Sequence, residues 1–99
     1  ADIDTAHEEL LDAEETYGAA KAAFEIGMAK ARLEMARGTT KMTAQEREDN
    51  ALTANAIEYR ELMAADALVR GCRANVNRIR TKVDIIRSLG ANTRVAMEM

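Results

Sequence analysis

The stretch that decides the fold covers residues 62–94 and reads LMAADALVRGCRANVNRIRTKVDIIRSLGANTR. Apolar residues recur in it at alternating steps of three and four, a spacing that places them on one face of a helix in a coiled coil. This apolar seam consists of Leu62, Ala65, Val69, Cys72, Val76, Ile79, Val83 and Ile86. The pattern predicts a long α-helix that packs one face against a neighbouring helix.

Four arginines follow the same helix at intervals of seven residues: Arg73, Arg80, Arg87 and Arg94. Seven residues make two helical turns, so the guanidinium groups are expected to form one stripe beside the seam. Arginines beside such a seam select a partner, because the guanidinium binds carboxylates and phosphates with paired hydrogen bonds. If Gly90 ends the helix, Arg94 leaves the stripe and three arginines remain in it.

The residues before this stretch predict a second long helix. Apolar and small residues at seam spacing run from Ile3 to Ala31, and we expect a helix over residues 5–36. Residues 37–43 are expected to form a turn, with Gly38 as a left-handed helix cap.

Thr43 and Glu46 have the spacing of a capping box, which starts the following helix. We expect that helix to cover residues 44–89, with a stutter or mild bend between Leu52 and Tyr59 where the seam slips in phase. Residues 90–99 are expected to be a short or frayed C-terminal segment.

The composition agrees with an all-α fold and a single domain over residues 1–99. The 99-residue chain has no proline, no tryptophan and only three aromatic residues, so it lacks the residues typical of strands and their turns. Two long helices joined by a short turn fold back as an antiparallel, coiled-coil-like hairpin.

The second helix is the longer one. Beyond about residue 80 it outruns the first helix, yet it keeps Val83, Ile86 and Leu89. Self-association into a homodimer or larger bundle would cover these side chains.

Charge and cysteine content favour a soluble, cytoplasmic protein. Residues 1–34 carry nine acidic and three basic residues, a balance of −6, whereas residues 68–99 carry two acidic and seven basic ones, a balance of +5. A single cysteine excludes an intrachain disulfide and fits a reducing compartment. There is no apolar run of about 18 residues and no signal-peptide pattern at the N-terminus.

The sequence offers little for catalysis. His7 and Cys72 are the only residues of their kinds, and there is no phosphate-binding loop or nucleophile elbow. Asp4 and His7 share one face of the first turn, but no inward glutamates accompany them as a helical metal site requires. We therefore expect no enzyme, no metal and no cofactor.

Three interpretations of the arginine stripe remain open. It can form a salt-bridge ladder with acidic residues of the first helix, either within one chain or between the chains of a dimer. It can also dock onto an acidic protein surface or bind the phosphates of a nucleic acid. The ladder would use Glu8, Glu9, Asp12 and Glu15. Protein docking would use Arg73, Arg80, Arg87, Val83, Ile86 and Leu89, and phosphate binding would add Arg70, Arg78 and Lys82.

Residues 66–89, DALVRGCRANVNRIRTKVDIIRSL, resemble the C-terminal helices of small hairpin proteins encoded by phages and prophages. Some members of that group lie among recombination or counter-defence genes. The resemblance covers about a quarter of the chain and carries no catalytic motif. It implies a small accessory protein or inhibitor that acts by binding and has no active site.

Overall fold

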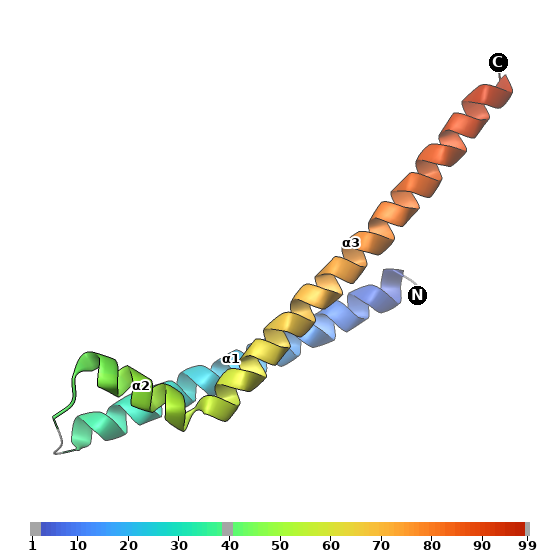
Figure 1. Ribbon diagram of the computed structural model, residues 1–99. Coiled ribbons are helices and arrows are strands. Elements are labelled where there is room, and N and C mark those ends of the chain that lie inside the picture. Colours follow the sequence, from blue (N-terminus) through green and yellow to red (C-terminus); the bar gives the residue numbers. More distant parts are fainter. Residues whose placement is uncertain (1–2, 39–40, 99) are drawn as a thin grey trace.

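The computed structural model describes residues 3–38 and 41–98, and the side chains of residues 3–38 and 41–94. Three α-helices make up almost all of this part of the chain, which contains no strand: α1 (Ile3–Arg37), α2 (Ala44–Ala54) and α3 (Ala56–Glu98). The molecule is a rod with extents of 85 × 22 × 14 Å (Figure 1). The all-α prediction is confirmed.

Helix α1 lies along α3, and α2 packs beside the last part of α1 (Figure 1). Contacts along the rod show the order of the pairing: Arg32 pairs with Glu48, the rings of Phe24 and Tyr59 are 5.7 Å apart, Glu14 pairs with Arg73, and His7 lies beside Arg80. Partner positions therefore rise along α2 and α3 as positions along α1 fall.

The core is a narrow strip between the helices. Its buried apolar residues are Ala6, Ala13, Met28, Ala51, Ala65, Val69 and Val76. On α3 the seam is shielded as far as Ile79, whereas Val83 and Ile86 are exposed. The seam pattern thus marks the packed face of α3 only where α1 runs alongside it.

The start of α2 has the capping geometry that its sequence predicts. The amide of Glu46 donates to the Thr43 hydroxyl over 3.1 Å, and the Thr43 amide donates to the Glu46 carboxylate over 3.4 Å. The prediction for Gly38 was wrong, because none of the described glycines has a positive φ. Its amide instead donates to the Met35 carbonyl over 3.2 Å, which ends α1 with a tighter turn.

The prediction of one continuous helix over residues 44–89 is corrected in two places, at Asn55 and after residue 89. Asn55, with φ −112° and ψ 28°, breaks the helix between α2 and α3. Its buried side chain donates to the Ala51 carbonyl over 2.9 Å and lies against Gly27 of α1. The break falls within the stretch where the seam slips in phase.

At the other end, α3 continues through Gly90 to Glu98, so the prediction of a separate segment over residues 90–99 was wrong as far as residue 98. A single glycine costs a helix only about 1 kcal/mol and does not stop it unless the backbone turns left-handed there. Arg94 consequently stays on the same helix as the other three arginines.

Gly27 is the glycine whose missing side chain the packing requires. A Cβ atom there would overlap the amide oxygen of Asn55 and lie 3.0 Å from its Cγ. We expect Gly27→Ala to lower the free energy of unfolding by about 1–3 kcal/mol, because the short buried side chain of Asn55 has to move. Urea unfolding followed by circular dichroism would measure the change.

The matched control is Gly18→Ala. No atom lies within 4 Å of a Cβ built at Gly18, so alanine should stabilise that helix by about 0.5–1 kcal/mol. Equal effects of the two substitutions would contradict the close approach of α1 to Asn55.

The link between α1 and α2 should depend on pH. Arg32 donates to both carboxylate oxygens of Glu48, over 2.9 and 3.0 Å, and this hydrogen bonding lowers the pKa of Glu48 from its ordinary 4.5. Since folding lowers this pKa, the pair stabilises the fold above about pH 4.5 and ceases to do so as the pH falls through the folded-state pKa. We expect Glu48→Gln to lower Tm slightly at pH 7 and not at pH 2.

Both partners are exposed, so 1 M salt should also shrink the difference. Glu25→Gln removes a carboxylate at an exposed position of α1 and serves as the control. It should leave Tm nearly unchanged at both pH values. A Tm difference for Glu48→Gln that persists at pH 2 would argue against this origin.

Candidate interaction surface

The first candidate surface is the part of α3 that lies beside the start of α1 and then extends past it. From Arg80 to Arg94 every side chain is exposed, and we call this stretch the overhang. Helix α1 begins at Ile3, which shares a shallow hollow with Val83 and Arg87, so α1 gives no cover beyond that point (Figure 1). A helix this exposed is stabilised mainly by packing against another element, and the described residues supply none beyond the start of α1.

The overhang exposes large apolar side chains. Ile86 is 67% exposed, Leu89 60%, Ile85 54% and Val83 37%. Several of these side chains continue the seam that α1 covers further back on α3. Apolar side chains that extend a packed seam into solvent are typical of a protein contact site.

Within one chain, the predicted ladder between the arginine stripe and the acidic residues of α1 does not form for the residues named, and its dimeric form stays a prediction. Arg73 pairs with Glu14 over 3.5 Å, and Nη2 of Arg80 lies 3.4 Å from Nε2 of His7. Within the described part of the chain, none of the four acids expected in the ladder takes part in a salt bridge. Those acids are Glu8, Glu9, Asp12 and Glu15, and all are exposed.

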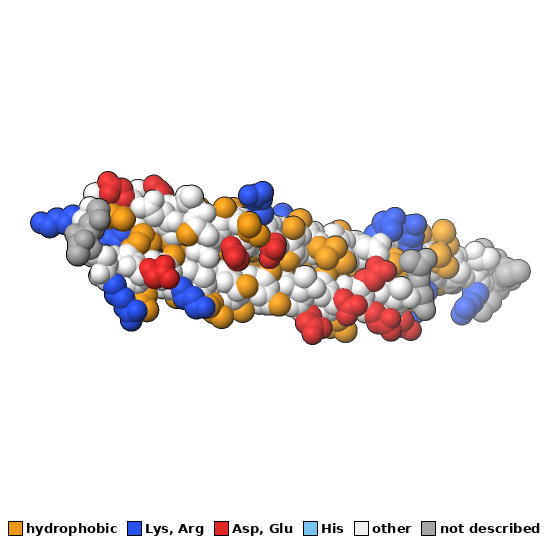
Figure 2. Space-filling model, turned by 90° about the horizontal axis from the view of Figure 1, so that it is seen from below, with side chains coloured by type: hydrophobic (Ala, Val, Ile, Leu, Met, Phe, Trp, Pro, Cys, Tyr) orange, Lys and Arg blue, Asp and Glu red, His pale blue; other side chains and the backbone are white. Residues whose placement is uncertain are grey.

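Helical spacing explains this separation of charge. Asp4, Glu8, Asp12 and Glu15 follow one another at steps of three or four, on the side of α1 away from the buried Ala6 and Ala13. In Figure 2, acidic side chains gather along one edge near the start of α1, and basic side chains lie on the opposite edge. Many of these charged side chains therefore stay exposed.

The arginine stripe keeps its position relative to the seam along α3. Arg73, Arg80 and Arg87 each directly follow a residue of the seam. Stripe and seam therefore share one seven-residue period and drift together, by about 20° per heptad on a straight helix. In the overhang, Arg87 borders the exposed Ile86, where a helix packed on the continued seam would meet it.

The basic residues proposed for phosphate binding lie elsewhere around α3. Arg70 pairs with Asp66 over 3.2 Å, and Arg78 donates to the Asn75 side chain over 2.7 Å. By helical spacing, Arg78 and Lys82 lie on a different side of α3 from the arginine stripe. The basic residues thus surround the helix and do not form a single band.

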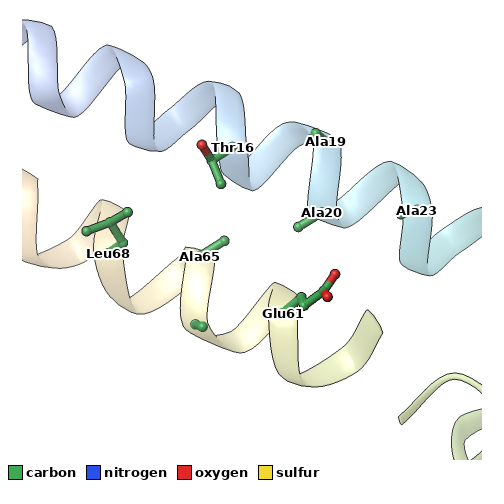
Figure 3. A pocket seen from close by; sticks show the side chains of 8 residues that line it. Thr16, Ala19, Ala20, Ala23, Glu61, Ala65 and Leu68 are labelled. Atoms are coloured by element: carbon green, nitrogen blue, oxygen red, sulfur yellow. The ribbon is translucent and has the colours of Figure 1, made fainter. Parts of the chain in front are cut away.

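A groove along one flank of the α1–α3 seam is a second candidate surface, which sequence reasoning missed. Its main hollow, of about 520 Å³, is lined by Thr16, Ala19, Ala20, Ala23, Glu61, Ala64, Ala65 and Leu68 (Figure 3). Figure 3 shows Ala20 and Ala65 pointing into the space between the helices. A further hollow of about 280 Å³ shares Thr16 and Leu68 with it and adds Glu9, Asp12, Ala13 and Cys72. We call the two together the alanine groove.

The alanine groove and the Arg73–Glu14 pair lie on opposite flanks of the seam. Residues lining the arginine flank include His7, Leu10 and Arg73, and none of these lines the groove. The alanines themselves were visible in the sequence. That so many of them line one flank of the seam depends on which side of α1 faces α3, which the sequence does not show. The floor of the groove is apolar, and Glu9, Asp12 and Glu61 supply negative charge to it.

Among the described residues no three His, Cys, Asp or Glu side chains are grouped as a metal site would need. None of the helices, over the residues described, combines the length and apolar character needed to cross a membrane. Cys72 is half-buried, with a free thiol at the edge of the alanine groove.

Comparison with protein-family models, with curated proteins and with solved structures found no match to this chain. The candidate surfaces therefore rest on the chain's own geometry.

Proposed function

We propose that this chain is a non-enzymatic protein–protein interaction module. It acts as an antiparallel helical hairpin that associates with copies of itself, and its arginines select an acidic surface on a further protein. The observation that carries the proposal is the overhang, where Ile86 and Leu89 extend the packed seam into solvent and Val83 is only partly shielded by Ile3. A small cytoplasmic accessory protein or inhibitor of the kind encoded by phages would work in this way.

The free energy gained by burying the overhang's apolar side chains is too small to drive stable association by itself. Fully burying a side chain such as isoleucine or leucine contributes about 1.5–3 kcal/mol. Bringing two chains together costs an estimated 4–15 kcal/mol in lost freedom of motion. Ile86 and Leu89, already partly shielded, reach only the lower part of that range, so a stable contact needs apolar surface on both partners.

The arginines differ in whether they already have a partner within the chain. Arg73 has Glu14 as an intramolecular partner, and Arg80 has His7 beside it. Arg87 takes part in no salt bridge of the described residues. Arg80 and Arg87 are therefore the proposed selectors, because a charge-assisted pair with a partner's carboxylate fixes register and suppresses wrong partners.

Self-association is tested by sedimentation equilibrium over micromolar concentrations. We expect the unaltered chain to form a dimer or larger assembly. Ile86→Asp should weaken that assembly by at least about tenfold, since an aspartate in an apolar contact is desolvated without a partner. Circular dichroism should show a chain that stays largely helical, because Ile86 is 67% exposed in the single chain and only the overhang depends on the assembly for its packing.

Ile57→Asp is the matched control. Ile57 is 65% exposed and lies at the start of α3, at the end opposite to the overhang. The same charge at that position should leave the assembly intact. A monomeric unaltered chain, or equal weakening by both substitutions, would refute the proposed role of the overhang.

Binding to nucleic-acid phosphates is the alternative function, and one observation favours it. Lys82, Arg87 and Arg94 are exposed and take part in none of the salt bridges of the described residues. Fluorescence anisotropy with single- and double-stranded DNA at about 50 mM salt tests it, because phosphate binding weakens steeply with salt. Binding that Lys82→Gln with Arg78→Gln weakens would support this function, and no binding at low salt would exclude it.

A further inference from the structure

We propose that the alanine groove of one chain holds the overhang of a second copy, and that the exchange is mutual. This inference rests on the proposed self-association and names the surface that the overhang meets. Each overhang would lie between α1 and α3 of the other copy and complete a three-helix bundle there. In the single chain both the groove and the overhang are exposed, and in the proposed dimer each would cover the other.

The lengths of the two surfaces agree. The groove follows α1 from Glu9 to Ala23, and the overhang runs from Arg80 to Arg94, so each spans fifteen residues. At 1.5 Å per residue, each is about 22 Å long. One overhang therefore fills one groove along its whole length.

The shapes agree as well. Alanines line the groove from both helices, so a third helix can approach closely and place large side chains over them. The overhang supplies these large side chains, chiefly Ile86 and Leu89. Leu68 at the groove, Ile79 and Ile86 are spaced by whole numbers of turns, so groove edge and overhang share one side of α3.

The charges of the two surfaces are opposite. Residues 80–94 contain four basic residues and one acidic residue, a balance of +3. The groove has Glu9, Asp12 and Glu61 in its lining, and the exposed Glu8 and Glu15 lie on the same helix nearby. Arg87 directly follows Ile86, and Arg94 lies two turns further along, so both would flank the docked apolar side chains and pair with these carboxylates.

Symmetry sets the direction of the pairing. The groove and the overhang occupy different parts of the same helix α3, so a closed pair that satisfies both copies needs a two-fold axis. The two α3 helices must then run antiparallel, with the overhang of each beside the groove of the other. In this arrangement Ile86 of one copy lies near Cys72 of the other, at the edge of the groove.

Disulfide trapping of an Ile86→Cys variant tests this arrangement. After mild oxidation, we expect covalent dimers whose mapped peptides join Cys72 of one copy to position 86 of the other. A bond within one chain is excluded, since the two positions are fourteen residues apart on one helix. That distance is about 21 Å, whereas a disulfide needs Cα atoms about 4.4–6.8 Å apart.

The background variant Cys72→Ser separates the outcomes. Loss of the covalent dimer when Cys72→Ser is added to Ile86→Cys supports the groove. A dimer that persists, joining position 86 to position 86, overturns groove docking and leaves self-association through the overhang intact. Covalent polymers overturn the two-fold pairing. A chain that is monomeric by sedimentation and forms no covalent dimer refutes both this inference and the proposed function.

A second pair of variants tests the groove without cysteines. Ala23 lines the groove, and its neighbour Ala22 is exposed and lines none of the described hollows. Ala23→Arg should raise the dissociation constant of the dimer by about tenfold or more, because it fills the groove and repels the basic overhang. Ala22→Arg should leave the constant unchanged. Equal effects would overturn the assignment of the groove.

Discussion

Close approach between α1 and the following helices is the constraint on which the rest of the structure depends. The buried residues at the contact are mostly small, among them Ala6, Ala13 and Ala65. At Gly27 the approach is close enough that the Asn55 side chain occupies the place of a Cβ atom. Small residues bring the helices together but bury little apolar area, so the hairpin has a thin core that a partner helix can extend.

The unequal lengths of the helices follow from this pairing and create the candidate surfaces. Helix α1 begins at Ile3, beside Val83 of α3, and the rest of α3 carries its apolar and basic side chains into solvent. The same thin pairing leaves an alanine-lined groove on one flank of the seam. The overhang is an exposed helix with basic side chains, and the alanine groove is open and carries acidic ones. The overhang of a second copy is therefore the proposed occupant of the groove.

Local signals in the sequence predicted the structure well where the responsible contacts are also local. The capping box of Thr43 and Glu46 involves residues three apart, so its geometry needs nothing from the rest of the chain. Predictions from glycines succeeded only in part. Helix α1 does end before Gly38, but without a left-handed cap. Helix α3 continues through Gly90, where the choice between helix and cap costs only about 1 kcal/mol.

The sequence by itself determined the all-α class and the face of each helix that packs, because both depend on residue types and their spacing along one chain. Only the tertiary structure decided the break at Asn55, since its side chain is held against Gly27 of a different helix. The tertiary structure also decided that Arg73 pairs with Glu14, while Glu8, Asp12 and Glu15 point outwards. These choices depend on the rotation and register of α1 against α3, which a one-dimensional pattern does not contain.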